Sequence, residues 1–367
     1  MSLRPEDLTE LVERAAERER ASPDRYPIES VSELFRSGLL IAPFPGSLGG
    51  DGWTPLDAVR AIEMLSAAAP STALVAAMPL GLAGIYGAGA DVAPPEYRAA
   101  WIAQTERVAA DYRSRRLYAA CNSEAGAGGS LAATKTVARS VGKGDWRITG
   151  TKILASSGAN ADMFLSTAKV SQEDLPGAGV VEFFYVPTHA PGVEIANDWD
   201  GFGMRATESQ SVHYEDAPAS EICGFPNFIE VVQPVTYWYC LFAAIPLGCA
   251  TGILNALSVP APASPAIRLR LADARMKQEA MSAYLYETAA AWRPAAGPAY
   301  AARVLRMKTY VSAEATKLCA ELFALSGGRH YRRDGVVARL LADSFAGTAL
   351  RPPLSLALDM LVEGFEG

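Results

Sequence analysis

The sequence predicts an α+β protein with three regions in order: an N-terminal helical domain (1–116), a central β-barrel-like domain (117–224) and a C-terminal antiparallel four-helix bundle (225–367). Apolar residues recur at helical spacing through most of the first region. Short β-branched and aromatic runs, separated by Gly, Pro and Asp turns, characterise the second. Long helical segments with proline-rich breaks make up the third.

The helices of the first region follow from start and stop signals. Thr54 and Pro55 are typical of a helix start, with Asp57 in the first turn. Residues 42–52, rich in Gly and Pro, predict a loop. The expected helices begin at Pro5, cover 30–38, begin at Thr54, cover 71–86 and cover 96–109.

Turn residues divide the other two regions in the same way. Gly, Pro and Asp separate the expected strands, and the segments VPAPASP and RPAAGP separate the long helices. The expected strands cover 134–140, 146–149, 163–170, 180–186 and 211–214. The expected helices cover 227–258, 265–293, 298–325, 336–344 and 353–363.

Composition narrows the range of partners. The net charge of −7 and the lack of a Lys/Arg run argue against nucleic acid. No two of the five cysteines have metal-ligand spacing, so we expect no metal site. The charged N-terminal segment lacks the apolar stretch of a signal peptide, and we expect a cytoplasmic protein.

One stretch is long and apolar enough to cross a bilayer. No charged residue lies between Glu230 and Arg268. Gln233, Pro246 and Asn255 interrupt this run, and no Lys/Arg cluster beside it would set a membrane topology. We therefore expect a helix buried in a bundle or a subunit interface, and no membrane partner.

Residues 118–168 are the most informative part of the chain. A glycine-rich bend at 123–130 precedes a strand-like run and a hairpin, and the loops offer backbone amides and small hydroxyls. Glu124 is the acid/base candidate of the bend. Such a surface suits a planar ligand with polar edges better than bond breaking by side chains.

The same stretch and two later ones carry family motifs. Residues 123–130 (SEAGAGGS) resemble a T-E-P-G-A-G-S-D loop, 146–152 (WRITGTK) a W-x-L-x-G-x-K hairpin, and 156–162 the segment after it. Residues 199–209 (WDGFGMRATES) resemble a G-M-R-A-T-x-S motif, and 325–331 (LSGGRHY) resemble a G-G-x-G-Y turn. In this order the chain resembles the acyl-CoA dehydrogenase superfamily, which includes two-component flavin monooxygenases.

The resemblance implies a flavin, normally FAD, between the β domain and the C-terminal bundle. Ser123 takes the place of the residue at the pyrimidine edge of the ring, and Ser156 that of the residue at the N5 side; both roles need a hydroxyl or amide. The cofactor-binding residues that the resemblance assigns are Ser123, Gly126, Gly129, Ser130, Ser156, Ser157, Gly327 and Gly328.

The sequence departs from the family at the catalytic base. Dehydrogenation needs a carboxylate that removes the α-proton of the substrate. If the family's E-G-T sequence is aligned with 346–348 (AGT), the usual Glu falls at Ala346. If the family's R-D pair is aligned with 342–343, it falls near Arg351. A position used by a minority of the family falls at Trp238. None of the three is a carboxylate.

The far end of the FAD site also departs from the family pattern. The segment whose Arg meets the FAD pyrophosphate across the dimer is replaced by 259–265 (VPAPASP), and the Gln before the G-G pair is Ala324. A bidentate, charge-assisted contact is thereby lost. The resemblance therefore implies FAD that is weakly bound or absent, or reduced flavin taken from a reductase.

A few other residues are candidates for the substrate side. Trp238 and Tyr239 suit a flat apolar ligand, with core packing as the alternative. Arg329 and His330 lie beside the glycine turn, and a surface histidine is the alternative for His330. Arg205 and Glu124 are expected to be structural.

Three functions stay open. The first is an acyl-CoA dehydrogenase-like oxidoreductase without the usual Glu, acting on an acyl-CoA-like or other small molecule. The second is a flavin-dependent monooxygenase or N-hydroxylase using reduced flavin and O2, which the missing Glu favours. The third is a non-catalytic homologue. We expect a homodimer or homotetramer, with the apolar helix after Glu230 supplying the surface.

Overall fold

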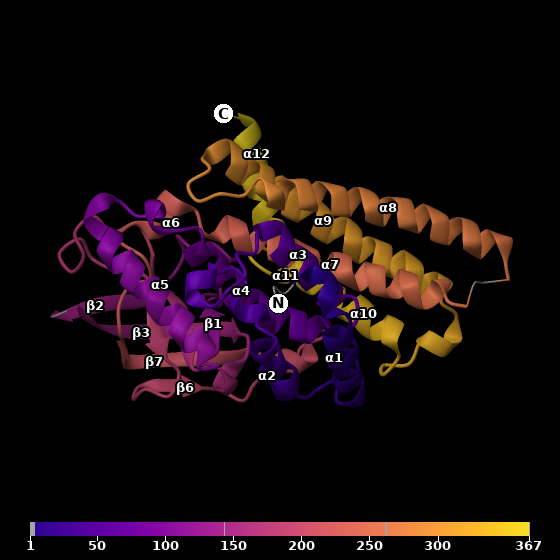
Figure 1. Cartoon of the computed structure of the whole chain (residues 1–367), viewed down its shortest axis with the longest axis horizontal. Coiled ribbons are helices and arrows are strands. Elements are labelled where there is room, and N and C mark those ends of the chain that lie inside the picture. Colours follow the sequence, from indigo (N-terminus) through magenta and orange to yellow (C-terminus); the bar gives the residue numbers. More distant parts are fainter. Residues whose placement is uncertain (1–3, 143, 261–262, 367) are drawn as a thin grey trace.

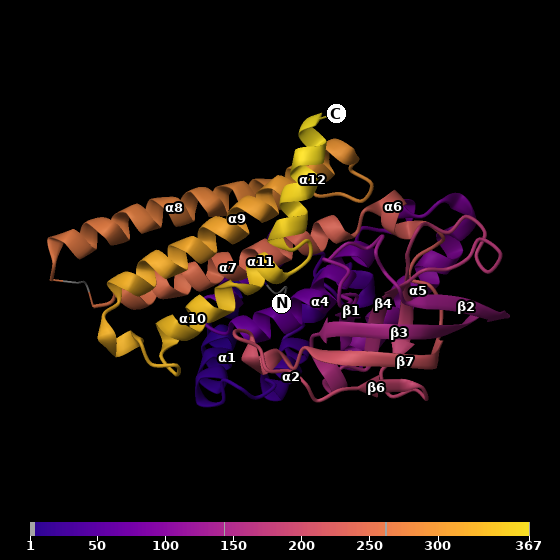
Figure 2. The ribbon, with the colours of Figure 1, turned by 180° about the vertical axis from the view of Figure 1, so that it is seen from behind.

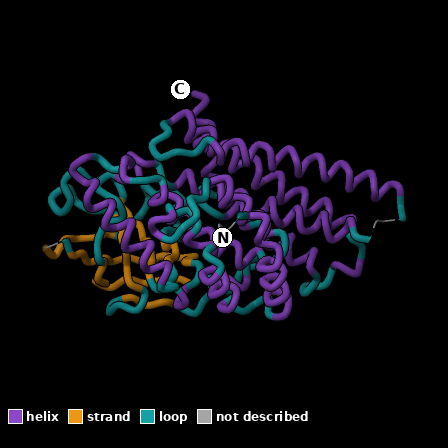
Figure 3. The backbone as a smooth tube through the Cα atoms, viewed as in Figure 1, coloured by secondary structure: helices purple, strands orange, loops and turns teal. Residues whose placement is uncertain are grey.

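The computed structural model describes residues 4–142, 144–260 and 263–366. The chain passes from helices to strands and back to helices, which confirms the predicted α+β order. Figures 1 and 2 show the long C-terminal helices running side by side away from the strands. In Figure 3 the strands gather at one end of the molecule, with helices over the rest.

The first region is helical as predicted. Thr54 caps the third helix: its hydroxyl accepts from the amide of Asp57, and the Asp57 carboxylate accepts from the Thr54 amide at 2.9 Å. The helix expected from Pro5 begins instead as a short 3₁₀ turn, Pro5–Leu8. The helices are α1 (Thr9–Ala21), α2 (Ile28–Arg36), α3 (Pro55–Ser66), α4 (Pro70–Gly87) and α5 (Arg98–Arg113).

The strands form two sheets, ordered β1-β4-β5 and β2-β3-β7-β6. Isolated bridges, Ser123 to Ile153 and Val137 to Lys169, join them; the barrel-like closure stays a prediction. Our sequence prediction missed β1, whose two alanines have low strand propensity, and the three-residue β6. The strands are β1 (Tyr118–Cys121), β2 (Val137–Gly142), β3 (Asp145–Ala155), β4 (Met163–Ala168), β5 (Glu182–Pro187), β6 (Val193–Ile195) and β7 (Gln210–Ala219).

The third region differs from the prediction in two ways: one expected helix is divided and one short helix was missed. The segment expected at 227–258 divides at Gln233, whose φ is 54°, and Pro234, because neither continues a helix. A short helix, α11, was missed. The helices are α6 (Phe228–Val232), α7 (Val235–Ser258), α8 (Pro265–Ala290), α9 (Pro298–Leu325), α10 (Val336–Ser344), α11 (Ala346–Ala349) and α12 (Leu354–Glu366).

The apolar helix α7 is the centre of the molecule. It packs against α8, α9 and α10 and also against α3 and α4 of the first region. Gly248 and Gly252 allow the approach to α3: a Cβ on Gly252 would lie 2.1 Å from the Ala67 carbonyl oxygen. Of the 18-residue windows apolar enough to span a membrane, the one in α7 is 83% buried and the one in α4 94%. The burial we predicted is confirmed.

The burial of α7 corrects our expectation that this helix supplies the surface between subunits. The residues of α7 are covered by helices of the same chain, so the helix leaves no large apolar surface for a second copy. The expectation that α7 supplies a subunit interface is wrong, because the first region folds over the face that we assigned to a partner.

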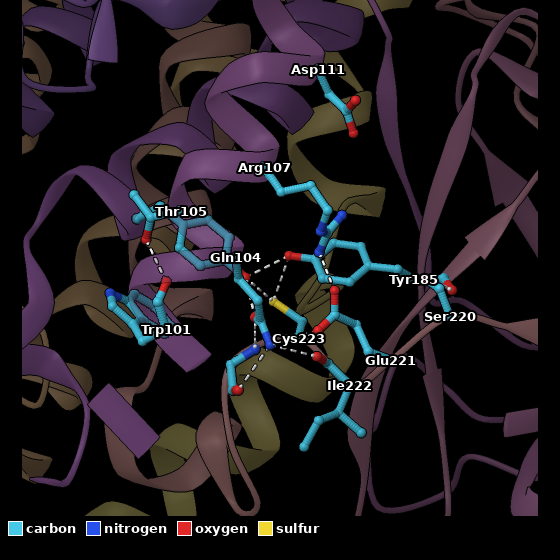
Figure 4. A network of polar contacts seen from close by, with 12 residues as sticks. Trp101, Gln104, Thr105, Arg107, Asp111, Tyr185, Ser220, Glu221, Ile222 and Cys223 are labelled. Atoms are coloured by element: carbon cyan, nitrogen blue, oxygen red, sulfur yellow. Dashed lines mark hydrogen bonds and ion pairs between the residues drawn. The ribbon is translucent and has the colours of Figure 1, made fainter. Parts of the chain in front are cut away.

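A polar network fixes the first region onto the strands (Figure 4). The side chain of Gln104 in α5 accepts from the amide of Gly224 at 2.7 Å. Arg107 of the same helix pairs with Glu221 at 2.6 Å and lies over the ring of Tyr185 in β5, 4.8 Å from its centroid. These contacts hold α5 against β5 and the segment that follows β7.

Candidate functional site

A cavity of about 300 Å³ lies where the three regions meet. Residues of α4, of the strands and their loops, of α7 and of the corner from α10 to Arg351 line it. Its volume falls at the lower end of the range of small-molecule sites, about 300–1,000 Å³. A flat ring can therefore fit with its remaining groups extending outward.

The lining is mostly apolar, with a few polar side chains. Trp199, Trp238 and Phe242 supply rings, whereas Ser123 and Ser156 supply hydroxyls. Among the described lining residues Arg351 is the only charged one, and no Asp, Glu, His or Lys is present. Side-chain proton abstraction by a carboxylate therefore has no candidate in this part of the cavity.

The Ser156 hydroxyl belongs to a chain of hydrogen bonds with a fixed direction. Thr207 donates to the Met204 carbonyl at 2.8 Å, so its only proton is used there. The Ser209 hydroxyl lies 2.7 Å from Thr207 and must donate to it. Ser156 lies 3.0 Å from Ser209 and must donate in turn. Ser156 is left with only acceptor capacity toward the cavity.

Unusual backbone conformations concentrate around this hydroxyl chain. Leu154 (φ 60°) and Met204 (φ 52°) line the cavity in the left-handed region. Ser157 (φ 77°) and Glu208 (φ 45°) adjoin Ser156 and Ser209 in the same conformation. Residues other than glycine rarely adopt this backbone conformation, and strained backbone of this kind is concentrated at ligand sites.

Glu124 lies behind the cavity in a saturated buried site. Its carboxylate accepts from Lys152 Nζ at 2.7 Å, from the Lys135 amide at 2.6 Å and from the Thr136 hydroxyl at 2.7 Å. Burial alone would raise the pKa of Glu124, but these hydrogen bonds lower it to about 2. The carboxylate is thus held charged by the loop, which supports a structural role.

Arg351 and Asn122 leave two polar atoms without partners. The Arg351 Nη2 donates to the Asn122 carbonyl at 3.1 Å. The Arg351 Nη1 and the Asn122 side-chain oxygen are buried without a hydrogen-bond partner among the described residues. Beside them, burial raises the pKa of Tyr239 to about 12, with Arg351 partly opposing this. Such orphaned groups call for a ligand or water.

The cavity brings together half of the predicted cofactor and substrate residues of the middle region and α7. Ser123, Ser156, Trp238 and Tyr239 line it, as do both positions of the missing carboxylate, Ala346 and Arg351. Ser157 is turned away and accepts from the Tyr26 hydroxyl at 3.0 Å. Gly126, Gly129 and Ser130 do not line the cavity; a Cβ on Gly129 would lie 2.3 Å from Pro353.

The glycine turn lies elsewhere in the chain. Gly327, Gly328 and Arg329 are exposed before the start of α10, whereas the other end of α10 reaches the cavity. Arg329 Nε donates to His330 Nε2 at 2.8 Å, and partial burial and Arg329 lower the pKa of His330. Within one chain, these residues do not join the serines. Arg205 pairs with Asp24, as expected of a structural ion pair.

Sequence reasoning missed several lining residues. Asn122 precedes the matched bend by one position, and Ser209 ends the G-M-R-A-T-x-S match, so both lay within reach of the motif. Trp199 and Phe202 lie in the matched stretch 199–209, next to the G-M-R-A-T-x-S positions. Phe345 carries no local signal, because an isolated aromatic residue is equally typical of a core.

Three family models match the chain in order. The acyl-CoA dehydrogenase N-terminal domain matches residues 8–105, the middle domain 119–217 and the C-terminal domain 240–349. Together they cover most of the chain.

Individual relatives agree with these models. The chain is 25% identical over 335 residues to the probable acyl-CoA dehydrogenase YngJ of Bacillus subtilis, covering 87% of this chain and 84% of that protein. It is 31% identical over 210 residues to the L-evernosamine nitrososynthase of Micromonospora sp., covering 56% of this chain and 46% of that protein.

A solved structure shares the whole fold. KijD3, in complex with FMN and dTDP-3-amino-2,3,6-trideoxy-4-keto-3-methyl-D-glucose, superposes with a TM-score of 0.84 at 20% identity. The superposition covers 99% of this chain and 92% of that chain.

Proposed function

The chain belongs to the acyl-CoA dehydrogenase superfamily, and from this membership we propose that it is a flavin-dependent oxidoreductase that oxygenates a small organic substrate. One observation carries the proposal: the described lining holds no carboxylate, and both positions of the usual base, Ala346 and Arg351, face the cavity. Removal of an α-proton needs such a base, whereas oxygen transfer from reduced flavin and O2 does not. The relation to a nitrososynthase supports the same choice.

The residues fit a flavin ring. The ring would lie against Trp199, and its polar edge would meet the Ser123 hydroxyl and the unpaired oxygen of Asn122. Bound reduced flavin would supply two electrons, so that O2 gives one oxygen atom to the substrate and one to water. The apolar walls would exclude bulk water from the reacting groups.

The Ser156 hydroxyl supports use of the reduced form. Its proton is committed to Ser209, so Ser156 can only accept a hydrogen bond from a ligand. At the N5 side that the resemblance assigns to Ser156, reduced flavin carries an N–H donor and oxidised flavin an acceptor. The hydroxyl chain thus favours the reduced ring.

The identity of the flavin is a narrower proposal. The resemblance implies FAD, whereas the KijD3 complex contains FMN. Of the segment that replaces the family's pyrophosphate-binding Arg, residues 261–262 lie outside the described part. The ring is common to both flavins, so the proposal rests on the ring site. The cytoplasmic location and the homodimer or homotetramer stay predictions.

Flavin binding in both redox states tests the proposal. Purified protein is titrated anaerobically with oxidised and reduced FMN and FAD, followed by flavin absorbance and tryptophan fluorescence. We expect the reduced form to bind more tightly and the bound reduced form to react with O2. Reduction of bound flavin by a saturated acyl-CoA would instead establish a dehydrogenase. If neither oxidised nor reduced flavin binds, the non-catalytic homologue is the candidate function that remains.

A further inference from the structure

Arg351 is a half-buried cation with one buried, unpaired guanidinium nitrogen. Its Nη2 donates to the Asn122 carbonyl at 3.1 Å, while Nη1 is buried without a hydrogen-bond partner among the described residues. A buried charged donor without a partner is strongly unfavourable, so such groups are kept where a ligand completes them. The side chain belongs to the lining of the cavity, which is where that ligand would enter.

The surroundings supply no carboxylate for this charge. Glu124 interacts electrostatically with Arg351, but its oxygens accept from Lys152, Lys135 and Thr136. Lys152 and Glu124 form a neutral pair, so neither charge balances Arg351. Val235, the first residue of α7, also lines the cavity, so the positive end of this long helix adds to the potential there.

A buried lysine holds the segment that carries Arg351. The Lys308 side chain is 1% exposed, and its Nζ donates to the Leu350 carbonyl at 2.8 Å and to the Pro352 carbonyl at 2.6 Å. These are the residues on either side of Arg351. Because Lys308 fixes both flanking peptides, the guanidinium is aimed by a rigid support.

We propose that Arg351 binds an oxyanion of the substrate, a carboxylate or a phosphate group, with Lys308 as its positioning residue. The class that fits is a small molecule with a flat apolar body, which packs on Trp238 and Phe242, and one such anionic group. Assigning the anion to the substrate, and not to the flavin, rests on the proposed function.

Matched anionic and neutral probes test this assignment. The flavin-loaded protein and the flavin-free protein are titrated calorimetrically with benzoate, phenyl phosphate and the neutral isostere benzamide. We expect at least one anion to bind about tenfold or more tightly than benzamide, as one charge-assisted hydrogen bond would give. The two anions show which oxyanion is preferred.

Variants assign the preference to a residue. Arg351→Gln is expected to abolish the anion preference and leave benzamide binding unchanged, and Arg351→Lys to keep part of it. Lys308→Met is expected to weaken the preference, with Lys308→Arg restoring part of it. Arg329→Gln is the matched control, because Arg329 is exposed and does not line the cavity. Thermal unfolding verifies that each variant is folded. Arg351→Gln and Arg351→Lys each test the proposal, so one of them remains informative if the other does not fold.

Several outcomes would overturn the proposal. They are equal wild-type binding of benzoate, phenyl phosphate and benzamide, no anion binding at millimolar concentration, or a preference that survives Arg351→Gln. A shift of flavin affinity or midpoint potential in Arg351→Gln, with anion preference intact, would assign the residue to the flavin instead. A chain that binds no flavin yet shows an Arg351-dependent preference would refute the proposed function and keep the anion site.

Discussion

Lys152 Nζ lies 2.7 Å from the Glu124 carboxylate, and the two side chains are 0% and 4% exposed. The pair ties β3 to the glycine-rich bend that carries Ser123. The backbone adds a second tie, because the Ile153 amide donates to the Ser123 carbonyl at 2.9 Å. The position of Ser123 at the cavity thus depends on a charge pair behind it.

Lys152→Met should destabilise the protein by about 3–5 kcal/mol, because it leaves a buried carboxylate without its counter-ion. Urea unfolding at pH 7 measures the change. The exposed Lys135→Met is the control and should change stability by no more than about 0.5 kcal/mol.

The same pair has a predictable pH dependence. The folded-state pKa of Glu124, about 2, lies below its unfolded value, so its contribution is complete above about pH 4.5 and is lost as the pH falls toward 2. In Lys152→Met this acid-side loss should be smaller. Equal acid profiles for wild type and variant would contradict the coupling.

Asp343→Asn should stabilise the protein at pH 8 by roughly 1–3 kcal/mol and have little effect near pH 4. Burial, and next Glu19, raise the pKa of Asp343 to about 7, against opposing effects of the Met204 amide and two arginines. Native Asp343 therefore holds its proton up to a higher pH than the unfolded chain, and stability falls as the pH rises from about 4 to 7.

Urea unfolding from pH 4 to 8 checks this prediction. The Asn oxygen can still accept from the Met204 amide, which Asp343 bonds at 2.6 Å, so the variant changes charge more than shape. Asp273→Asn, at a half-exposed carboxylate, is the control and should leave the profile unchanged. A variant less stable than wild type at pH 8 would mean that the carboxylate is charged and needed.

Ser209→Ala should reduce the preference for reduced over oxidised flavin by about fivefold, the size of one net hydrogen bond. Without Ser209, the Ser156 proton is free to point into the cavity, which then offers a donor where it offered an acceptor. Anaerobic titrations with both redox states measure the ratio, and the midpoint potential should fall. Ser47→Ala, in an exposed 3₁₀ turn, should change neither value. An unchanged ratio in Ser209→Ala would contradict the fixed direction of the chain.

Gly81→Ala should cost about 1–3 kcal/mol although alanine favours helices. A Cβ at Gly81 would lie 2.1 Å from Trp238 Nε1, which donates to the Met78 carbonyl at 3.2 Å. Trp238 must move, and since it lines the cavity, ligand binding should weaken as well. Thermal unfolding and flavin titration measure both effects. Gly46→Ala meets nothing within 4 Å and serves as control.

No cysteine should react with Ellman's reagent in the folded protein at pH 8, and all five should react in denaturant. Every thiol is free and buried, and burial raises the pKa of Cys121 to about 11 and of Cys240 to about 12. Thiol absorbance over time provides the count. Fast reaction of one native thiol would show that the structure around it opens.

Local signals explain which parts of the fold were predictable. The cap at Thr54 and the glycine and proline breaks act within a few residues, so the helices and most strands were found. The strand β1 was missed because its residues favour it weakly; its pairing with β4 stabilises it instead. Gln233 ends α6 through a backbone conformation that its residue type does not indicate.

The site was predictable only in part, for the same reason. Ser123 and Ser156 lie in motifs, and the structure places both at the cavity. Gly328 and His330 also lie in a motif, yet the length of α10 separates them from the cavity. A motif does not say which end of the following helix lies at the site. The direction of the Ser156 hydroxyl depends on Thr207, which no local pattern relates to it.

By itself, the sequence determined the order of helices and strands, the family, and the absence of a carboxylate at the expected positions, because these depend on residue types and short spacings. Only the tertiary structure brought Arg351 to Asn122, 229 residues away, and left the guanidinium half-paired in an apolar cavity. Contacts at such separation form through the packing of whole elements, here α7 against α9 and α11 and Lys308 against the segment that carries Arg351.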